Sequence, residues 1–231
     1  MPNNNRTCTL HDPKIQAFLE RAYQKTKGER LRLGVPLILN ALLGRKWSLE
    51  EYVQRTKEMY IPLSRERGTF AYLLARSINA RRIVEFGTGF GISTIYLAAA
   101  IKDNGGGVVI GSEMEPTKVE QARRNLEEMG LAEYVEIRPG DARETLADPG
   151  GNVDMLLVDG HKDFYIDIVK LLTPHLRPGA VVLGDNVTTG APILKGLVPY
   201  VNFMKDLQNG FCSVTIPFKD GLEYSVRILM N

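Results

Sequence analysis

The period of the hydrophobic pattern changes once along the chain. Before about residue 80, apolar residues recur at spacings of three and four, which indicates amphipathic helices. This pattern runs from Pro13 to about Tyr60 and includes Ile15, Phe18, Leu19 and Ala22, then Leu31, Val35 and Leu39. Ser48, with Glu51 three residues later, predicts a capping box that opens a helix through Met59. Another helix is predicted from Thr69 to Asn79.

Beyond that point, short Val/Ile/Leu runs alternate with amphipathic stretches, which is typical of a parallel sheet covered on both faces. Strands are predicted at 82–86, 108–113, 135–139, 153–159 and 180–185, and helices at 92–102, 117–129, 142–147, 164–176 and about 192–207. The runs 212–217 and 223–229 flank a turn at Lys219–Gly221 and predict a terminal antiparallel hairpin. The expected fold is therefore α/β, with a doubly wound, mostly parallel seven-stranded sheet and extra N-terminal helices.

Composition adds limits to this picture. The chain has 231 residues, 44% of them hydrophobic, and a net charge of +2, so a nucleic-acid partner is not expected. Two distant cysteines predict no disulfide, and the absence of a signal peptide or a long apolar run predicts a cytoplasmic protein that does not enter the membrane. We expect an N-terminal helical cap at 1–60 and the main domain at 61–231.

A glycine turn follows the first predicted strand. Gly87, Gly89 and Gly91 let the backbone pass close to a ligand, and the next helix directs free N–H groups to the same place. Ile92 stands where a dinucleotide fingerprint needs its last glycine, which disfavours a nicotinamide dehydrogenase. Glu85 would repel phosphate but suits a cationic amino-acid group. A tight strand-to-helix connection is the alternative reading.

Two further acids end the next strands. Glu113 could accept both hydroxyls of a ribose, or it could be a solvated strand-end acid. Asp141 could contact an adenine amino group, cap the helix that begins at Ala142, or do both.

Oxygen ligands end the fourth and fifth strands. Asp159, Asp185 and Asn186 form a set that suits Mg²⁺, or Ca²⁺ or Mn²⁺, and does not suit zinc. Three protein oxygens leave positions for two adjacent phenol oxygens of a substrate. Lys162 would stand beside the cation as a base. Alone, Asp159 would be read as a turn residue and Lys162 as a surface cation, but the pair with Asp185 and Asn186 favours the site.

Other polar residues are less informative. His161 could be a base or merely a residue that faces the substrate. Arg65 and Arg67 are expected at the surface, although the stretch from Ser64 to Gly68 is an unusual polar break between predicted helices and could cover a cofactor.

These motifs resemble the cation-dependent O-methyltransferases, the family of catechol and caffeoyl-CoA O-methyltransferases. The similar segments run from about Met59 to Leu229 and are 84–94, 110–113, 153–165, 183–187 and 219–223, with 64–73 similar to the segment that covers the cofactor. The sequence departs from the family pattern at Gly160–His161 and in the N-terminal helices, which in the family shape the substrate pocket.

The resemblance implies a Rossmann-like fold and a homodimer, with S-adenosylmethionine and Mg²⁺ as cofactors. The residues it places at the cofactor are Glu85, Gly87, Gly89, Gly91, Ser93, Glu113, Asp141, Ala142 and Asp159. It makes Asp159, Asp185 and Asn186 the metal ligands, Lys162 and Asp159 catalytic, and Glu223, with His161, a weaker substrate candidate.

The expected reaction is methyl transfer to a hydroxyl of a catechol-type small molecule. Two alternatives stay open. One is a metal-dependent methyltransferase for a sugar or polyketide hydroxyl, and the other is a non-catalytic S-adenosylmethionine-binding protein.

Overall fold

We describe a computed structural model of the chain at residues 8–26, 43, 47–188 and 197–229. Two sequence predictions fall outside these residues. They are the helical pattern at Leu31, Val35 and Leu39 and the first residues of the helix predicted from about 192.

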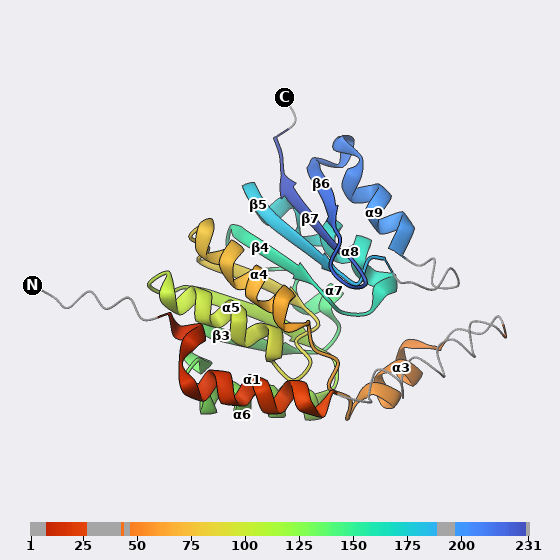
Figure 1. Cartoon of the computed structure of the whole chain (residues 1–231). Coiled ribbons are helices and arrows are strands. Elements are labelled where there is room, and N and C mark those ends of the chain that lie inside the picture. The colour runs from red at the N-terminus through yellow and green to blue at the C-terminus, as the bar shows by residue number, and fades with distance from the viewer. Residues whose placement is uncertain (1–7, 27–42, 44–46, 189–196, 230–231) are drawn as a thin grey trace, which may run out of the picture.

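A seven-stranded sheet forms the centre of the molecule (Figure 1). Its strands are β1 Arg82–Phe86, β2 Val108–Glu113, β3 Val135–Pro139, β4 Val153–Val158, β5 Leu176–Asp185, β6 Phe211–Ile216 and β7 Leu222–Arg227. They lie in the order β3-β2-β1-β4-β5-β7-β6. Pairs among β1 to β5 are parallel, whereas β7 runs antiparallel to β5 and β6. The predicted fold is confirmed, including the terminal hairpin.

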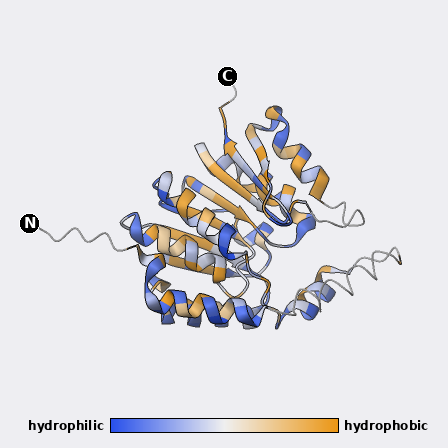
Figure 2. Ribbon diagram, viewed as in Figure 1, coloured by the Kyte–Doolittle hydropathy of each residue, from blue (hydrophilic) through white to orange (hydrophobic). Residues whose placement is uncertain are grey.

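Helices cover both faces of this sheet. The core on one face includes residues of α1 Pro13–Lys25, α4 Arg65–Ser77, α5 Ile92–Asp103 and α6 Pro116–Glu128. The other face packs against α7 Ala142–Thr145, α8 Tyr165–Leu172 and α9 Val198–Lys205. Figure 2 shows hydrophobic residues gathered along the strands and hydrophilic residues on the outer helices. Neighbouring strand residues such as Ile83 and Val84 belong to opposite cores because side chains alternate along a strand.

The remaining described elements are short. Helix α3 spans Leu49–Thr56, and the capping box predicted for Ser48 and Glu51 is present at its start. Single 3₁₀ turns lie at Thr9–His11, Ala132–Tyr134, Lys162–Phe164, Thr173–His175 and Leu207–Asn209.

Helix α4 differs from its prediction. It begins at Arg65, four residues before the predicted start, because the Ser64 hydroxyl accepts a hydrogen bond from the Arg67 N–H and caps the first turn. The polar stretch from Ser64 to Gly68 is therefore the first turn of a helix and not a break between helices. The expectation that Arg67 lies at the surface is also wrong, since its side chain is 2% exposed.

The direction in which the sheet grows reverses at β1. The chain adds β2 and β3 on one side of β1 and then returns to add β4 on the other. Ligands of doubly wound folds bind beyond the carboxyl ends of the strands at such a point. The glycine turn after β1 and Asp159 after β4 lie at this position.

Two other expectations concern the chain as a whole. Cys8 and Cys212 are free thiols. Among the residues that the structure describes, none of the helices combines the length and the apolar character needed to cross a membrane.

Candidate active site

The two main sequence motifs touch at the reversal point of the sheet. The Asp159 N–H donates to the carbonyl of Phe86 at 2.9 Å, which joins the ends of β4 and β1. Gly87 follows with φ of +97°, and a Cβ on this residue would lie 2.7 Å from the Cα of Gly160. A side chain at Gly87 would therefore separate the glycine turn from the Asp159 segment.

Glu85 lies beneath the glycine turn in a cradle of hydroxyl groups. Its Oε2 accepts hydrogen bonds from the hydroxyls of Thr88 at 3.2 Å and Thr94 at 2.5 Å. The residue is fully buried, and its Oε1 has no hydrogen-bond partner among the residues that the structure describes. Burial raises the pKa of this carboxyl to about 7. A buried acceptor without a donor fits a ligand that brings an N–H group, such as the predicted amino group.

Glu113 reaches back to the glycine turn. Its Oε2 accepts from the N–H of Gly89 at 2.8 Å, and its Oε1 accepts from the N–H of Glu115 at 2.9 Å. The side chain is therefore not the freely solvated acid of the alternative reading. Gly91, with φ of +81°, is the N-cap of α5.

The remaining candidate cofactor residues border the same edge. Asp141 caps α7 by accepting from the N–H of Arg143 at 2.9 Å, and it also forms an ion pair with the Arg143 side chain. The helix-capping role is thus confirmed, and contact with an adenine stays a prediction. Ala142 and Ser93 are buried, each with 6% exposure.

The predicted metal ligands Asp185 and Asn186 converge on one point. Nη1 of Arg67 donates to the Oδ1 atoms of both residues, at 2.9 Å in the case of Asn186. Asn186 has φ of +56°, a left-handed conformation that asparagine tolerates better than most residues. The two oxygens therefore face a single cation-sized position.

Asp159 is the third predicted metal ligand, and we call Asp159, Asp185 and Asn186 together the donor group. Burial raises the pKa of its carboxyl to about 7, the charge of Asp185 raises it further, and the positive charges of Lys162 and Arg67 oppose the shift. Two carboxylates whose charges influence each other, with one amide oxygen, make an all-oxygen set whose chemistry fits a hard divalent cation.

Lys162 lies at the rim of the donor group. Its Nζ is 3.5 Å from Oδ1 of Asp159 and 3.2 Å from the backbone carbonyl of Asp185. Nζ also donates to the hydroxyl of Tyr165, which in turn donates to the Asp185 carbonyl at 3.1 Å. Tyr165 therefore fixes the position of the Lys162 amine.

The two weaker substrate candidates lie in different places. His161 packs edge-on against Tyr52 of α3, with ring centroids 5.0 Å apart, beside the Asp159 segment. Glu223 is fully buried and accepts from the hydroxyls of Ser213 and Thr215, each at 2.5 Å. In the β5–β7 register Glu223 pairs with Gly184, so its side chain leaves the sheet on the face opposite that of Asp185.

Sequence reasoning missed three residues at this edge. Arg67 and Tyr165 contact the donor group, and Tyr52 lies close enough to Asp159 and Glu113 that their charges, after burial, raise its pKa to about 12. The polar first turn of α4 carried a signal for Arg67, because Ser64 is a good N-cap. Tyr52 carried none, since the approach of α3 to the sheet edge is a tertiary feature.

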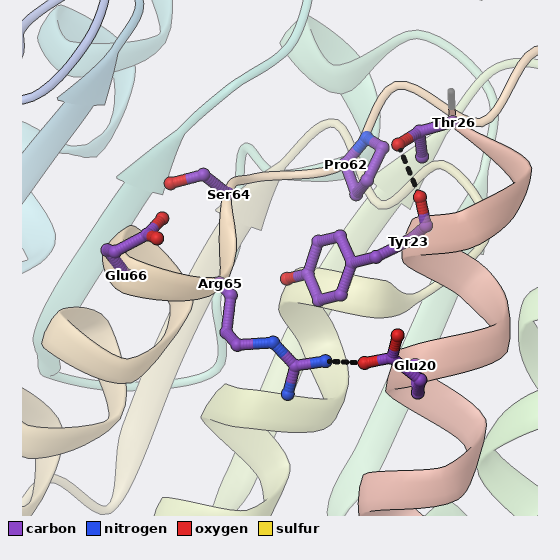
Figure 3. A pocket seen from close by; sticks show the side chains of 7 residues that line it. All are labelled: Glu20, Tyr23, Thr26, Pro62, Ser64, Arg65 and Glu66. Carbon is purple, nitrogen blue, oxygen red and sulfur yellow. Dashed lines mark hydrogen bonds and ion pairs between the residues drawn. The ribbon is translucent and has the colours of Figure 1, made fainter. Parts of the chain in front are cut away.

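A cavity of about 280 Å³ borders the start of α4 (Figure 3). It is lined by Glu20, Tyr23, Thr26, Pro62, Ser64, Arg65 and Glu66, none of them a candidate cofactor or metal residue. Arg65 points across it to Glu20 at 2.9 Å, whereas Arg67, two residues later, reaches the sheet edge.

Comparison with known proteins agrees with this geometry. Residues 84–187 match the model of a family described as a methyltransferase domain. A catechol O-methyltransferase from Mycobacterium tuberculosis is 38% identical over 135 residues, and the match covers 58% of this chain and 60% of that protein, less than two thirds of its length. A caffeoyl-CoA O-methyltransferase from Petunia hybrida is 26% identical over 185 residues, and the match covers 71% of this chain and 76% of that protein.

The solved structures share the fold. An O-methyltransferase from Streptomyces achromogenes involved in tomaymycin synthesis, solved with S-adenosylmethionine, has 27% identity and a TM-score of 0.66. The similarity covers 85% of this chain and 96% of that one. The doubly wound, Rossmann-like architecture expected from the sequence is therefore confirmed.

Proposed function

We propose that this homologue of the catechol and caffeoyl-CoA O-methyltransferases, which matches the methyltransferase-domain model over residues 84–187, transfers the methyl group of S-adenosylmethionine to a hydroxyl of a small catechol-type molecule. The contact between Gly87 and Gly160 carries this proposal. It brings a glycine turn suited to a nucleoside against a segment that holds a carboxylate and a lysine, as a transfer between two bound molecules requires.

The cofactor would occupy the edge above the glycine turn. The Oε1 atom of Glu85, which has no partner among the described residues, would accept a hydrogen bond from the amino group of S-adenosylmethionine. Glu113 now accepts a hydrogen bond from the N–H of Gly89 and would instead accept hydrogen bonds from the ribose hydroxyls. Asp141 and Ala142 would border the adenine.

Asp159, Asp185 and Asn186 would hold a divalent cation, with Mg²⁺ first and Ca²⁺ or Mn²⁺ as alternatives. The convergence of the Asp185 and Asn186 Oδ1 atoms and the all-oxygen chemistry of the three residues support this assignment. A cation bound there supplies charge stabilisation to an acceptor oxygen as it loses its proton.

Lys162 is the proposed base. The acceptor hydroxyl gives its proton to a neutral Nζ, and a lone pair of that oxygen forms the new bond to the methyl carbon as the carbon–sulfur bond breaks. The sulfur keeps the bonding pair, and S-adenosylhomocysteine leaves without the sulfonium charge. Tyr165 holds Nζ beside Asp159 through this exchange.

The test is release of S-adenosylhomocysteine from S-adenosylmethionine with a panel of catechols, caffeoyl esters and catechol-bearing natural products. Each reaction is run with Mg²⁺ and with EDTA. Release that requires both a vicinal diphenol and Mg²⁺ is the expected result. Binding of S-adenosylmethionine without release on any acceptor would instead indicate a non-catalytic binding protein.

A second candidate is methylation of a non-phenolic hydroxyl in natural-product biosynthesis. The similarity to the O-methyltransferase involved in tomaymycin synthesis favours keeping it. Sugar and polyketide acceptors added to the panel distinguish the two, because this candidate requires release on those acceptors and none on simple catechols.

A further inference from the structure

The guanidinium of Arg67 lies where a divalent cation would contact its ligands. One nitrogen, Nη1, donates to the Oδ1 atoms of both Asp185 and Asn186. A metal held by these residues would need the same two oxygens. Arg67 and a metal therefore cannot hold both at once in this arrangement.

Arg67 is fixed in this position from several sides. Its other terminal nitrogen, Nη2, donates to the carbonyl of Lys219 in the β6–β7 turn. That turn is also hydrogen-bonded to the chain just after Asn186, because the N–H of Thr188 donates to the carbonyl of Asp220 at 2.9 Å. The side chain is 2% exposed and its ion-pair partner Asp185 is 1% exposed, so water screens the pair little.

The acidic groups at this edge already have cationic partners without a metal. Arg67 is paired with Asp185, and Nζ of Lys162 lies 3.5 Å from Oδ1 of Asp159. A dication added beside an unmoved guanidinium would meet a positive charge at short range in a poorly screened site, which is strongly unfavourable. The metal can enter only if the guanidinium leaves.

We propose that Arg67 is a resident counter-charge that competes with the divalent cation for Asp185 and Asn186, so that metal binding requires its guanidinium to move out of the site. The proposal rests on the metal site of the proposed function. If the guanidinium holds the oxygens for about nine tenths of the time, the apparent metal affinity is about tenfold weaker than the ligands alone would give.

The experiment measures Mn²⁺ binding directly, by calorimetry and by loss of the free-ion electron paramagnetic resonance signal. It compares the wild-type chain, Arg67→Met, which keeps an apolar side chain of similar length without the charge, and Arg65→Met as the matched control. Arg65 lies in the same helical turn but pairs with Glu20 across an exposed surface. Arg67→Met is expected to bind Mn²⁺ at least about tenfold more tightly than wild type, and Arg65→Met equally to it.

Equal affinity of wild type and Arg67→Met would overturn the competition, and so would the absence of binding in both. Methyl transfer is measured on the same samples. Tighter Mn²⁺ binding by Arg67→Met, with no methyl transfer by wild type or variant on any acceptor, would reject the proposed function and leave the competition standing.

A second measurement uses the wild-type protein and does not depend on the folding of a variant. Crystals with Mn²⁺ locate the metal by anomalous scattering and show the Arg67 side chain beside it. Manganese on Asp185 and Asn186 with the guanidinium displaced supports the proposal. Manganese on both residues with Arg67 still donating to them overturns it.

Discussion

At the scale of single residues, two buried carboxylates are kept in the sheet edge by different means. Glu85 accepts hydrogen bonds from hydroxyls, and burial raises its pKa to about 7 despite them, whereas Asp185 is paired with the Arg67 guanidinium. Both solutions offset the cost of removing a carboxylate from water. The first leaves an acceptor for a ligand, and the second leaves a cation that a ligand must replace.

Lys162→Ala is expected to lower turnover by roughly 10²- to 10⁴-fold, because it removes the proposed proton acceptor. S-adenosylmethionine binding should persist, since Lys162 contacts Asp159 and Tyr165 and not the glycine turn. Kinetics together with calorimetry check both points. Lys170→Ala, on α8 and packed over Phe203, is the control. Near-full activity of the Lys162 variant would refute the assignment of the base.

Glu85→Gln is expected to flatten the pH dependence of stability. The pKa of Glu85 is about 7 in the folded protein against an ordinary value of 4.5. Because the folded state keeps the proton longer, this contribution is full below the unfolded pKa and is lost as pH rises through about 7. The free energy of unfolding of the variant, from denaturant titrations, should therefore fall less steeply with pH than that of wild type.

The exposed Glu120→Gln on α6 is the control for that series, and its pH slope should match wild type. If the free energy of unfolding changed with pH equally in wild type, Glu85→Gln and Glu120→Gln, the raised pKa of Glu85 would be contradicted. At pH 8 the Glu85 variant should also bind S-adenosylmethionine about 10- to 100-fold more weakly, the usual value of a hydrogen bond to a charged group.

At the scale of elements, the first turn of α4 determines where Arg67 lies. Ser64 starts the helix early enough that Arg67 falls in its first turn, and the β6–β7 turn then accepts one of its hydrogen bonds. An N-cap and a hairpin turn far apart in the sequence thus position one side chain together.

Ser64→Ala is expected to lower the free energy of unfolding by about 1 kcal/mol, because the Arg67 N–H loses its cap. Thermal and urea unfolding measure the effect. Ser77→Ala, in the last turn of the same helix, removes a hydroxyl that bonds to the Leu74 carbonyl and caps nothing, so it should cost much less. Equal losses in the two variants would argue against the cap.

At the scale of the whole molecule, the reversal of the sheet at β1 brings the site together. Gly87 and Asp159 are far apart in sequence, yet they follow neighbouring strands and pack backbone to backbone. The glycine turn and the Asp159 segment are therefore in backbone contact, so a displacement of one displaces the other.

Gly87→Ala is expected to disrupt both halves of the site. Its Cβ would lie 2.7 Å from Gly160, and its φ is +97°. Gly106→Ala is a matched control, with φ of +108° and no atom of the described residues within 4 Å of its added Cβ. Strained backbone alone should cost each variant about 1–3 kcal/mol of stability. Only Gly87→Ala should also weaken S-adenosylmethionine binding, measured by calorimetry. Similar S-adenosylmethionine affinities of the two variants would contradict a role for the Gly87–Gly160 contact in the site.

The sequence by itself predicted the seven strands along the chain and most of their bounds to within one residue, because buried parallel strands and amphipathic helices leave different periods in the chain. Strand β5 is an exception, since it begins at Leu176, four residues before its predicted start. Strands β1, β2 and β3 were predicted with the bounds that the structure has. The parallel topology then places residues that end neighbouring strands at one edge, so Glu85, Asp159 and Asp185 could be grouped in advance.

Only the tertiary structure decided what faces those residues. Arg67 was expected at the surface and lies buried against Asp185 and Asn186. Glu223 leaves the sheet on the face opposite that of Asp185, and its contact with a substrate stays a prediction. Neither outcome is local. The position of Arg67 depends on how α4 crosses the sheet, and that of Glu223 on the register of the hairpin against β5. Spacing along the chain records periods within an element, but it does not record how separate elements pack.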